Sequence, residues 1–368
     1  MPAYLSSASV SRNFAWNPRL AHLRGLAAVL VLAFHTFHYF FGQWKPQSQA
    51  FGFGLVVEGH TGVSLFFVLS GFLFMSIAMQ GDGHIDYGRF IRNRVLRIAP
   101  LFLVVFMVAI SVGRDAFRPQ DLLYVLFSNL GAAPTSSTFM TGAAWTISVE
   151  FTFYLVFPFL ARFAMEQGPG YLLRLIGLLL LFKLGGFLAT GHSTHMVYST
   201  LLGRADQFLI GMLAALLAGR WLRKPLHGIW PVLAFVLIWG LVEMQARWAS
   251  FFLPAQPYQW AWAIWPTVEA LGWATVIVAY AHWQGQVPTR LGRWLEQGGE
   301  ISFSIYLWHA LVITLLGHAI GTPDWFADWR ANAVVTGLLV FGLTFWVARL
   351  SYQTIEAPFL GMRKRYVP

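Results

Sequence analysis

The stretch RGLAAVLVLAFHTFHYFFGQ, residues 24–43, decides the fold class of this chain. Its one full charge is Arg24, at the first position, and most of the residues that follow are apolar or aromatic. A helix of this length rises ~30 Å at ~1.5 Å per residue, which matches the hydrocarbon core of a bilayer. We therefore expect a membrane-spanning helix here.

Similar apolar stretches recur along the whole sequence, so it predicts an all-α, polytopic membrane protein with about ten transmembrane helices. The spans are placed at 24–43, 60–80, 98–113, 143–163, 172–190, 201–219, 229–245, 260–282, 301–320 and 332–350. The apolar segment 119–130 is too short to cross a bilayer. It is predicted to form an interfacial or re-entrant helix on the outer side.

The composition excludes several other classes of protein. Hydrophobic residues make up 57% of the chain and charged residues only 11%, whereas soluble domains carry roughly 25% charged residues. A soluble globule would lack the charges to coat its surface, and a disordered chain would lack these apolar and aromatic residues. The absence of cysteine excludes disulfides, thiolate metal sites and a cysteine nucleophile, and we expect no metal.

The net charge of +10 would suggest nucleic acid as the partner of a soluble chain, but a membrane protein gathers Lys and Arg in its inner loops. Eighteen of the 25 Lys and Arg residues fall on one side of the predicted spans and six on the other. Both termini are therefore expected in the cytoplasm, with no nucleic-acid partner. Segment 1–20 precedes the membrane domain, 21–358, and a basic tail follows at 359–368. Because segment 1–20 has no apolar run, we expect the first span to be an uncleaved anchor.

Two ionisable residues share one face of the first span. Arg24 and His35 are eleven positions apart, which is close to three full turns and about 16 Å along the helix. His35 therefore lies near the middle of the membrane, and His38 follows at i+3. A neutral imidazole at that depth can accept the proton of a hydroxyl group. The alternative is a histidine that hydrogen-bonds neighbouring helices for packing.

Glu150 lies about 7–8 Å below the outer start of the fourth span, which begins near Trp145. A carboxylate at that depth needs a partner. It can orient and charge a catalytic imidazole, as in acyl-transfer triads, or it can form a structural ion pair.

The stretch YGRFIRNRVLRIAP, residues 87–100, carries four arginines before the third span. Arg89 and Arg92 are three positions apart, as are Arg94 and Arg97, so each pair can share a helix face. Clustered guanidinium groups bind phosphate with two hydrogen bonds each. The alternative is that these arginines only set the topology.

These residues resemble the acyltransferase-3 family of integral membrane acyltransferases, which acylate glycans and other carbohydrate-bearing acceptors. Arg24 and His35 match the family's Arg-x10-His signature. Further matches follow in family order: GVSLFFVLSGFLF at 62–74, RVLRIAP at 94–100, WTISVEFTFYLVFP at 145–158, SFSIYLWHALV at 302–312 and IEAPF at 355–359. Together they cover nearly the whole chain.

The resemblance implies ten membrane helices in the bacterial cytoplasmic membrane and an acyl-CoA donor, most often acetyl-CoA, bound from the cytoplasm. It implies a carbohydrate or lipid-linked glycan as the acceptor. It also implies a functional core formed by Arg24, His35, Glu150 and the Arg94/Arg97 pair, assisted by Arg89 and Arg92. His309 and Glu356 match family patterns with either structural or functional roles. Arg204 and Asp206 match a recurring family element at the outer end of the sixth span.

The chain departs from the family pattern at three positions. Ala21 and Phe151 stand where many members have acidic residues, and Asn93 replaces a frequent arginine. Because Glu150 is kept, we expect activity. The sequence ends shortly after IEAPF, so we expect the stand-alone form without a fused extracytoplasmic hydrolase-like domain.

The leading hypothesis is transfer of an acyl group, acetyl or succinyl, from CoA to a sugar hydroxyl, with His35 as the base or as a transient acyl carrier. One rival is a transporter or flippase for an anionic or glycolipid cargo, whose path the same polar residues would line. A non-catalytic scaffold is disfavoured. Burying Arg, His and Glu costs folding free energy, and a scaffold would give no reason for that cost. The sequence names neither the acceptor nor an oligomeric state.

Overall fold

The computed structural model describes residue 13 and residues 17–44, 52–113, 139–191, 194–222, 224–248, 250, 259–321 and 323–368. In these residues, ten helices are long and apolar enough to cross a membrane, which confirms the predicted fold class. They are α1 (Pro18–Trp44), α3 (Thr61–Ala78), α4 (Tyr87–Val112), α6 (Phe139–Gln167), α7 (Pro169–Thr190), α9 (Leu201–Trp221), α10 (Ile229–Trp248), α11 (Gln259–Ala281), α13 (Ser302–Ile320) and α14 (Trp329–Ser351). The predicted helix at 119–130 lies outside the described residues.

Short helices connect or flank these spans. They are α2 (Gly54–Val57), α8 (Thr194–Ser199), α12 (Thr289–Glu300) and α15 (Ala357–Gly361), with a 3-10 turn at Met79–Gly81 and a π-helical turn at Tyr352–Glu356.

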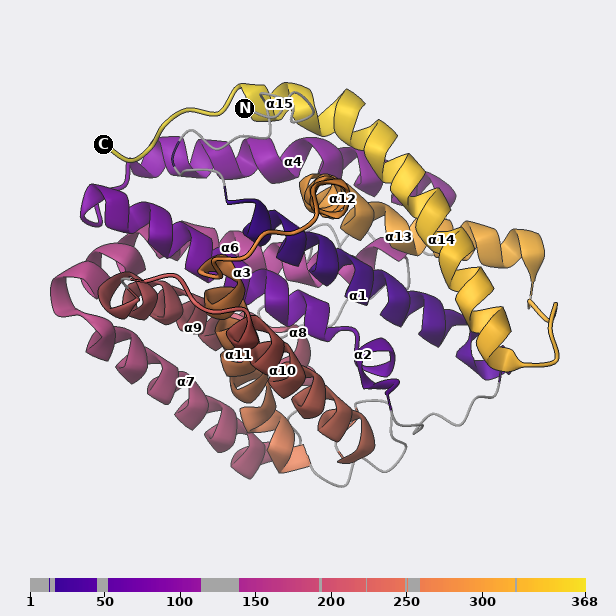
Figure 1. Cartoon of the computed structure of the whole chain (residues 1–368), viewed down its shortest axis with the longest axis horizontal. Helices are drawn as coiled ribbons and strands as arrows, with labels where there is room; N and C mark the ends of the chain where they lie inside the picture. Colours follow the sequence, from indigo (N-terminus) through magenta and orange to yellow (C-terminus); the bar gives the residue numbers. More distant parts are fainter. Residues whose placement is uncertain are drawn as a thin grey trace.

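The helices α1 and α3 form the centre of the bundle. In the most apolar window of each, 72% of the residues are buried, against 17% for α7 and 22% for the last span, which includes α14. Figure 1 shows α1 in the middle of the molecule, with α7 and α14 on opposite sides. The residues Arg24 and His35 therefore lie on a helix that is surrounded by protein.

Two glycines let α3 and α9 approach each other closely. A Cβ atom on Gly71 would collide with the carbonyl oxygen of Phe208, and one on Gly211 would collide with that of Val68. Small residues at such crossings allow backbones to touch, which is how membrane helices associate without a hydrophobic driving force.

The prediction that the third span begins at residue 98 is wrong, because α4 already begins at Tyr87. The side chain of Asp86 caps this helix by accepting a hydrogen bond from the backbone N–H of Arg89 at 2.9 Å. Arginine is also a good helix former. The four arginines of the 87–100 stretch therefore lie on the first turns of one helix rather than in a loop.

The tail at 359–368 packs against the membrane domain, and its predicted boundary at 358 falls inside α15. The side-chain amide of Asn93 donates to the backbone oxygen of Lys364 at 2.6 Å and accepts from its N–H at 3.0 Å. Tyr366 is only 3% exposed and contacts the ring of Phe90 edge-on. The tail therefore closes against the first turns of α4 (Figure 1).

Candidate active site

Residues of α1, α3, α4, α6 and α13 line a narrow cavity of about 100 Å³. Four of the predicted site residues, Arg24, Arg94, Arg97 and Glu150, lie on its wall. The other lining residues are Val63, Phe66, Phe67, Ser70, Phe74, Ile98, Thr146, Ile147, Tyr154, Ser302, Phe303 and Tyr306. The cavity thus combines cationic groups with apolar and aromatic walls.

Arg97 is held in place by a buried carboxylate. Its Nη1 lies 3.1 Å from Oε2 of Glu356, which is 1% exposed, and its guanidinium lies over the ring of Phe303. The hydroxyl of Ser304 donates a short hydrogen bond to the other oxygen of Glu356. Glu356 and Ser304, which belong to the two closing family patterns, therefore act on the predicted site through Arg97.

Arg94 lies among aromatic rings and keeps an unmet hydrogen-bond donor. Its guanidinium carbon is 4.9 Å from the ring centre of Phe74 and 5.8 Å from that of Tyr154. Its Nε atom is buried and has no hydrogen-bond partner. A buried donor without a partner is costly, so this atom favours an anion that can accept from it.

A further arginine, which the sequence did not single out, belongs to the same cationic region. Burial, together with the neighbouring charges of Arg97 and Arg94, lowers the pKa of Arg363 to about 10. Arg363 follows α15 and precedes Lys364, whose backbone pairs with Asn93. Sequence reasoning did not mark Arg363 because the topology rule already explains a basic segment at a cytoplasmic terminus.

Arg89 and Arg92 lie apart from this cavity. Arg89 is exposed and pairs with Asp86 at 3.0 Å, and it lines a different surface hollow near Arg162. Five residues of helix rotate a side chain by ~500°, so Arg89 points ~140° away from Arg94. Arg94 and Arg97 thus line the cavity with Arg24, whereas Arg89 and Arg92 are not among its lining residues.

Glu150 faces the cationic cavity rather than the imidazole of His35. Its Oε1 accepts a hydrogen bond from Ser70 at 2.9 Å, and its charge acts on Arg24. The side chain that contacts His35 is instead His309, at 3.2 Å. The expected pairing of Glu150 with His35 is therefore not present in the structure, because Glu150 lines the cavity together with the arginines and His35 does not.

His35 connects to the cavity through α13. Its Nδ1 lies 2.9 Å from the carbonyl oxygen of Val31 and 3.2 Å from Nε2 of His309. The Nδ1 of His309 in turn lies 2.6 Å from the carbonyl oxygen of Tyr306, whose hydroxyl pairs with Thr146 at 2.7 Å. Tyr306 and Thr146 line the cavity, whereas His35 does not, so the two imidazoles extend the polar path beyond it.

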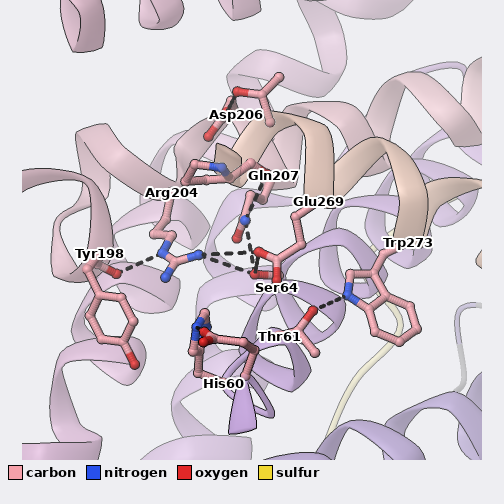
Figure 2. Close-up of polar contacts among 12 residues, drawn as sticks. His60, Thr61, Ser64, Tyr198, Arg204, Asp206, Gln207, Glu269 and Trp273 are labelled. Atoms are coloured by element: carbon pink, nitrogen blue, oxygen red, sulfur yellow. Dashed lines mark hydrogen bonds and ion pairs between the residues drawn. The ribbon is translucent and has the colours of Figure 1, made fainter. Parts of the chain in front are cut away.

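A second polar network lies between α3, α9 and α11, and Figure 2 shows it around Arg204. The Nε of Arg204 donates to the backbone oxygen of Tyr198 at 2.7 Å, and its Nη1 donates to Ser64 at 3.2 Å. Ser64 donates to Glu269 at 2.5 Å and accepts from Gln207 at 3.0 Å. These contacts join α3, α9 and α11 to one another and to α8, which carries Tyr198, so the predicted Arg204 element has a structural role.

Two further buried pairs flank this network. Lys183 of α7 lies 2.7 Å from Asp206 of α9, both side chains are fully buried, and Thr267 also donates to Asp206. Glu58 contacts His60 at 2.8 Å. Among the residues that the structure describes, no group of three or more His, Asp or Glu side chains is arranged to hold a metal ion.

In the part of the chain that the structure describes, ten candidate spans define a multi-pass membrane protein, and a cation-lined cavity lies between its helices. Residues 17–351 match the acyltransferase domain of the acyltransferase-3 family. The chain belongs to this family and is an acyltransferase, which confirms the resemblance.

Relatives with known names cover most of this chain. ORF330 of Acidianus two-tailed virus is 25% identical over 85% of this chain and 88% of its own length. Peptidoglycan O-acetyltransferase OatA of Listeria monocytogenes is 25% identical over 93% of this chain and 55% of its own length. O-acetyltransferase OatA of Staphylococcus aureus is 23% identical over 93% of this chain and 57% of its own length. The chain thus spans little more than half of each OatA protein, and no solved structure matches it significantly.

Proposed function

We propose that this protein transfers an acyl group, acetyl in the first instance, from acyl-CoA to a hydroxyl group of a carbohydrate acceptor. The observation that supports this most is the convergence of Arg24, Arg94 and Arg97 on one cavity with apolar walls. The names of the OatA relatives, both O-acetyltransferases, support acetyl as the group and oxygen as the acceptor atom.

The arginines suit the phosphates of CoA. Guanidinium groups bind phosphate oxygens through paired hydrogen bonds, and Arg94 has a buried donor available for one. The cavity of about 100 Å³ is far smaller than the ~300–1,000 Å³ pockets that hold whole drug-sized ligands. In our proposal the nucleotide therefore lies at the end of the cavity that Arg94 and Arg97 line, which we call the arginine-lined mouth. Only the thin pantetheine arm enters the cavity.

The pantetheine arm would run along Phe66, Phe67 and Phe303 toward Tyr306. Beyond Tyr306 lies His35, which is partly exposed. In our proposal an acceptor hydroxyl reaches it from the side away from the arginines. His35 would take the proton of this hydroxyl as the oxygen attacks the thioester carbonyl. A thiolate is a good leaving group, so the step needs no strong general acid.

Glu150 has a different task in this scheme from the one expected of it. Glu150 accepts a hydrogen bond from Ser70, and its charge acts on Arg24, so it brings a negative charge into the cationic cavity. We propose that it holds the Arg24 guanidinium beside the donor while leaving Arg94 and Arg97 to the phosphates. The orienting partner of His35 is then another residue.

The proposed surroundings follow from the charge distribution and the family. Both termini and the arginine-lined mouth face the cytoplasm, and the acceptor approaches from outside. The acceptor is a carbohydrate or a lipid-linked glycan, and the membrane is the bacterial cytoplasmic membrane.

The test uses the purified protein in lipid nanodiscs with radiolabelled acetyl-CoA and a membrane glycan extract. Release of free CoA that requires the extract, together with label on a glycan, is the expected result. The His35→Ala variant should insert and bind CoA but transfer no label. Consumption of acetyl-CoA that is independent of any acceptor would contradict the proposal, as would uptake of cargo into vesicles without loss of the thioester.

A further inference from the structure

We infer that His309, together with the carbonyl oxygen of Val31, fixes the tautomer of His35, and that the two thereby make Nε2 of His35 the proton-accepting atom of the site. The tautomer assignment comes from hydrogen-bond partners alone. Its consequence for catalysis rests on the proposed function, in which His35 is the base.

The carbonyl oxygen of Tyr306 determines which nitrogen of His309 carries a proton. This oxygen can only accept, and Nδ1 of His309 lies 2.6 Å from it, so Nδ1 carries a proton. His309 is 1% exposed, and its polar ring contacts are the backbone carbonyls of Tyr306 and Ile305 and another imidazole, so nothing negative compensates a charged ring. The neutral ring has one N–H, and Nε2 of His309 is therefore a lone-pair acceptor.

The proton on His35 is fixed by its neighbours in the same way. Its Nδ1 lies 2.9 Å from the carbonyl oxygen of Val31 and 3.2 Å from Nε2 of His309. Both neighbours are acceptors, so Nδ1 of His35 must be the donor to them. In neutral His35 the remaining nitrogen, Nε2, therefore carries the lone pair.

His309 thus takes the position that a carboxylate holds in an acyl-transfer triad, where it fixes the orientation and the tautomer of the base. The difference is that the partner is a neutral imidazole. It directs the proton to Nδ1 without adding a negative charge at membrane depth, where an unpaired charge is costly. This explains how His35 can be aligned although Glu150 lies elsewhere.

The transfer step balances with this assignment. The acceptor's O–H bond breaks and its proton moves to Nε2 of His35, while the oxygen forms a bond to the acyl carbon. The C–S bond breaks, and its electron pair stays on sulfur. The thiolate then takes a proton from the His35 imidazolium, which leaves CoA, the ester and a neutral ring that again carries its proton on Nδ1.

Nitrogen NMR on protein with isotope-labelled histidine tests the assignment without any substrate. The His35 signals are identified by their loss in His35→Asn, a variant used only for this purpose. We expect protonated Nδ1 and unprotonated Nε2 for His35 in the wild type, and a smaller excess of this tautomer in His309→Ala, where only the carbonyl oxygen of Val31 still accepts from Nδ1. A wild-type His35 protonated at Nε2 would overturn the inference, whether or not the protein transfers acetyl groups.

A pair of variants separates the two hydrogen bonds of His309. An asparagine can replace its Nδ1 donor to Tyr306 but does not reach His35, whereas a glutamine places a polar atom near the former Nε2. We expect His309→Asn to lower kcat by at least about tenfold with the KM for acetyl-CoA unchanged, and His309→Gln to recover part of that loss.

His318→Asn is the matched control. This exposed histidine lies on the same helix, and its ring hydrogen-bonds to the backbone oxygen of Thr314, one turn earlier. It should keep wild-type turnover. CoA binding measured on each variant reports that the protein is folded. Wild-type kcat in His309→Asn would overturn the positioning role, whereas a wild type without acceptor-dependent CoA release would instead refute the proposed function.

Discussion

At the scale of single residues, each arginine is held by different partners. Arg97 is fixed by Glu356, Arg94 by aromatic rings, and Arg89 by an exposed aspartate on its own helix turn. A guanidinium that is held rigidly at a cavity wall loses little entropy when it binds phosphate. The contribution of each arginine to donor binding should therefore follow its location.

The first prediction concerns these arginines. Replacing Arg94 by Ala, or Arg97 by Lys, removes charged hydrogen bonds that are each worth about 1.5–3 kcal/mol, which corresponds to roughly 10- to 100-fold. We expect the KM for acetyl-CoA to rise by that factor in steady-state assays. The control Arg89→Ala should change the KM by less than about twofold because its pair is exposed. Equal effects at Arg89 and Arg94 would contradict the assigned donor site.

The second prediction concerns the buried pair of Lys183 and Asp206. Both side chains are fully buried, so Lys183→Met leaves a buried carboxylate without its cation, at a cost of about 3–5 kcal/mol. A lower midpoint in thermal unfolding, followed by tryptophan fluorescence, checks this. Arg162→Met breaks an exposed pair with Glu166 and should cost less than about 1 kcal/mol. Equal midpoints for the two variants would show that the buried pair is not structural.

The sequence predicted part of the site and missed the rest for identifiable reasons. Helical spacing and the family motifs marked Arg24, Arg94, Arg97 and Glu150, and the structure brings these four side chains to one cavity. Their roles in catalysis and donor binding stay predictions. The contact of His35 with His309 joins residues far apart in the chain, and no local spacing encodes it. Spacing likewise could not tell that Glu150 would face the arginines.

At the scale of helices, apolar length was enough to place the spans but not the start of α4. The hydropathy signal begins at residue 98, whereas the helix begins at Tyr87 because Asp86 caps it. This extension matters for function, since it turns the RVLRIAP stretch into a rigid element that sets the directions of Arg94 and Arg97.

The third prediction concerns the crossing of α3 and α9. A leucine at Gly71 would place its Cβ against the backbone of Phe208, which cannot give way as a flexible side chain can. We expect Gly71→Leu to lose at least about 1–3 kcal/mol of stability and to lower the yield of monodisperse protein in size-exclusion chromatography. Gly177→Leu on α7 has open space around its Cβ and should behave like the wild type. A normal profile for Gly71→Leu would contradict the observed packing.

At the scale of the whole molecule, the proposed reaction requires that the arginine-lined mouth and the acceptor side face opposite compartments. The charge asymmetry of the loops predicts that the turn between α3 and α4 is cytoplasmic and that the segment between α13 and α14 is external. The tail packs beside α4, which would place it at the cytoplasmic surface as well.

The fourth prediction tests this orientation, and the absence of native cysteine makes it direct. Single cysteines at the exposed positions His84 and Asp324 report the two sides. In right-side-out vesicles, an impermeant maleimide should label Asp324→Cys at once and His84→Cys only after the membrane is permeabilised. The reverse pattern would place the arginines outside and refute a cytoplasmic donor.

The central claim is that the cavity of Arg24, Arg94 and Arg97 holds the acyl donor. A cryo-EM structure of the protein in nanodiscs with a non-hydrolysable acetyl-CoA analogue tests it most directly. The account predicts phosphate density within hydrogen-bonding distance of Arg94 and Arg97, with the acyl end directed toward Tyr306 and His35. Density for the nucleotide at any other place on the protein would contradict it.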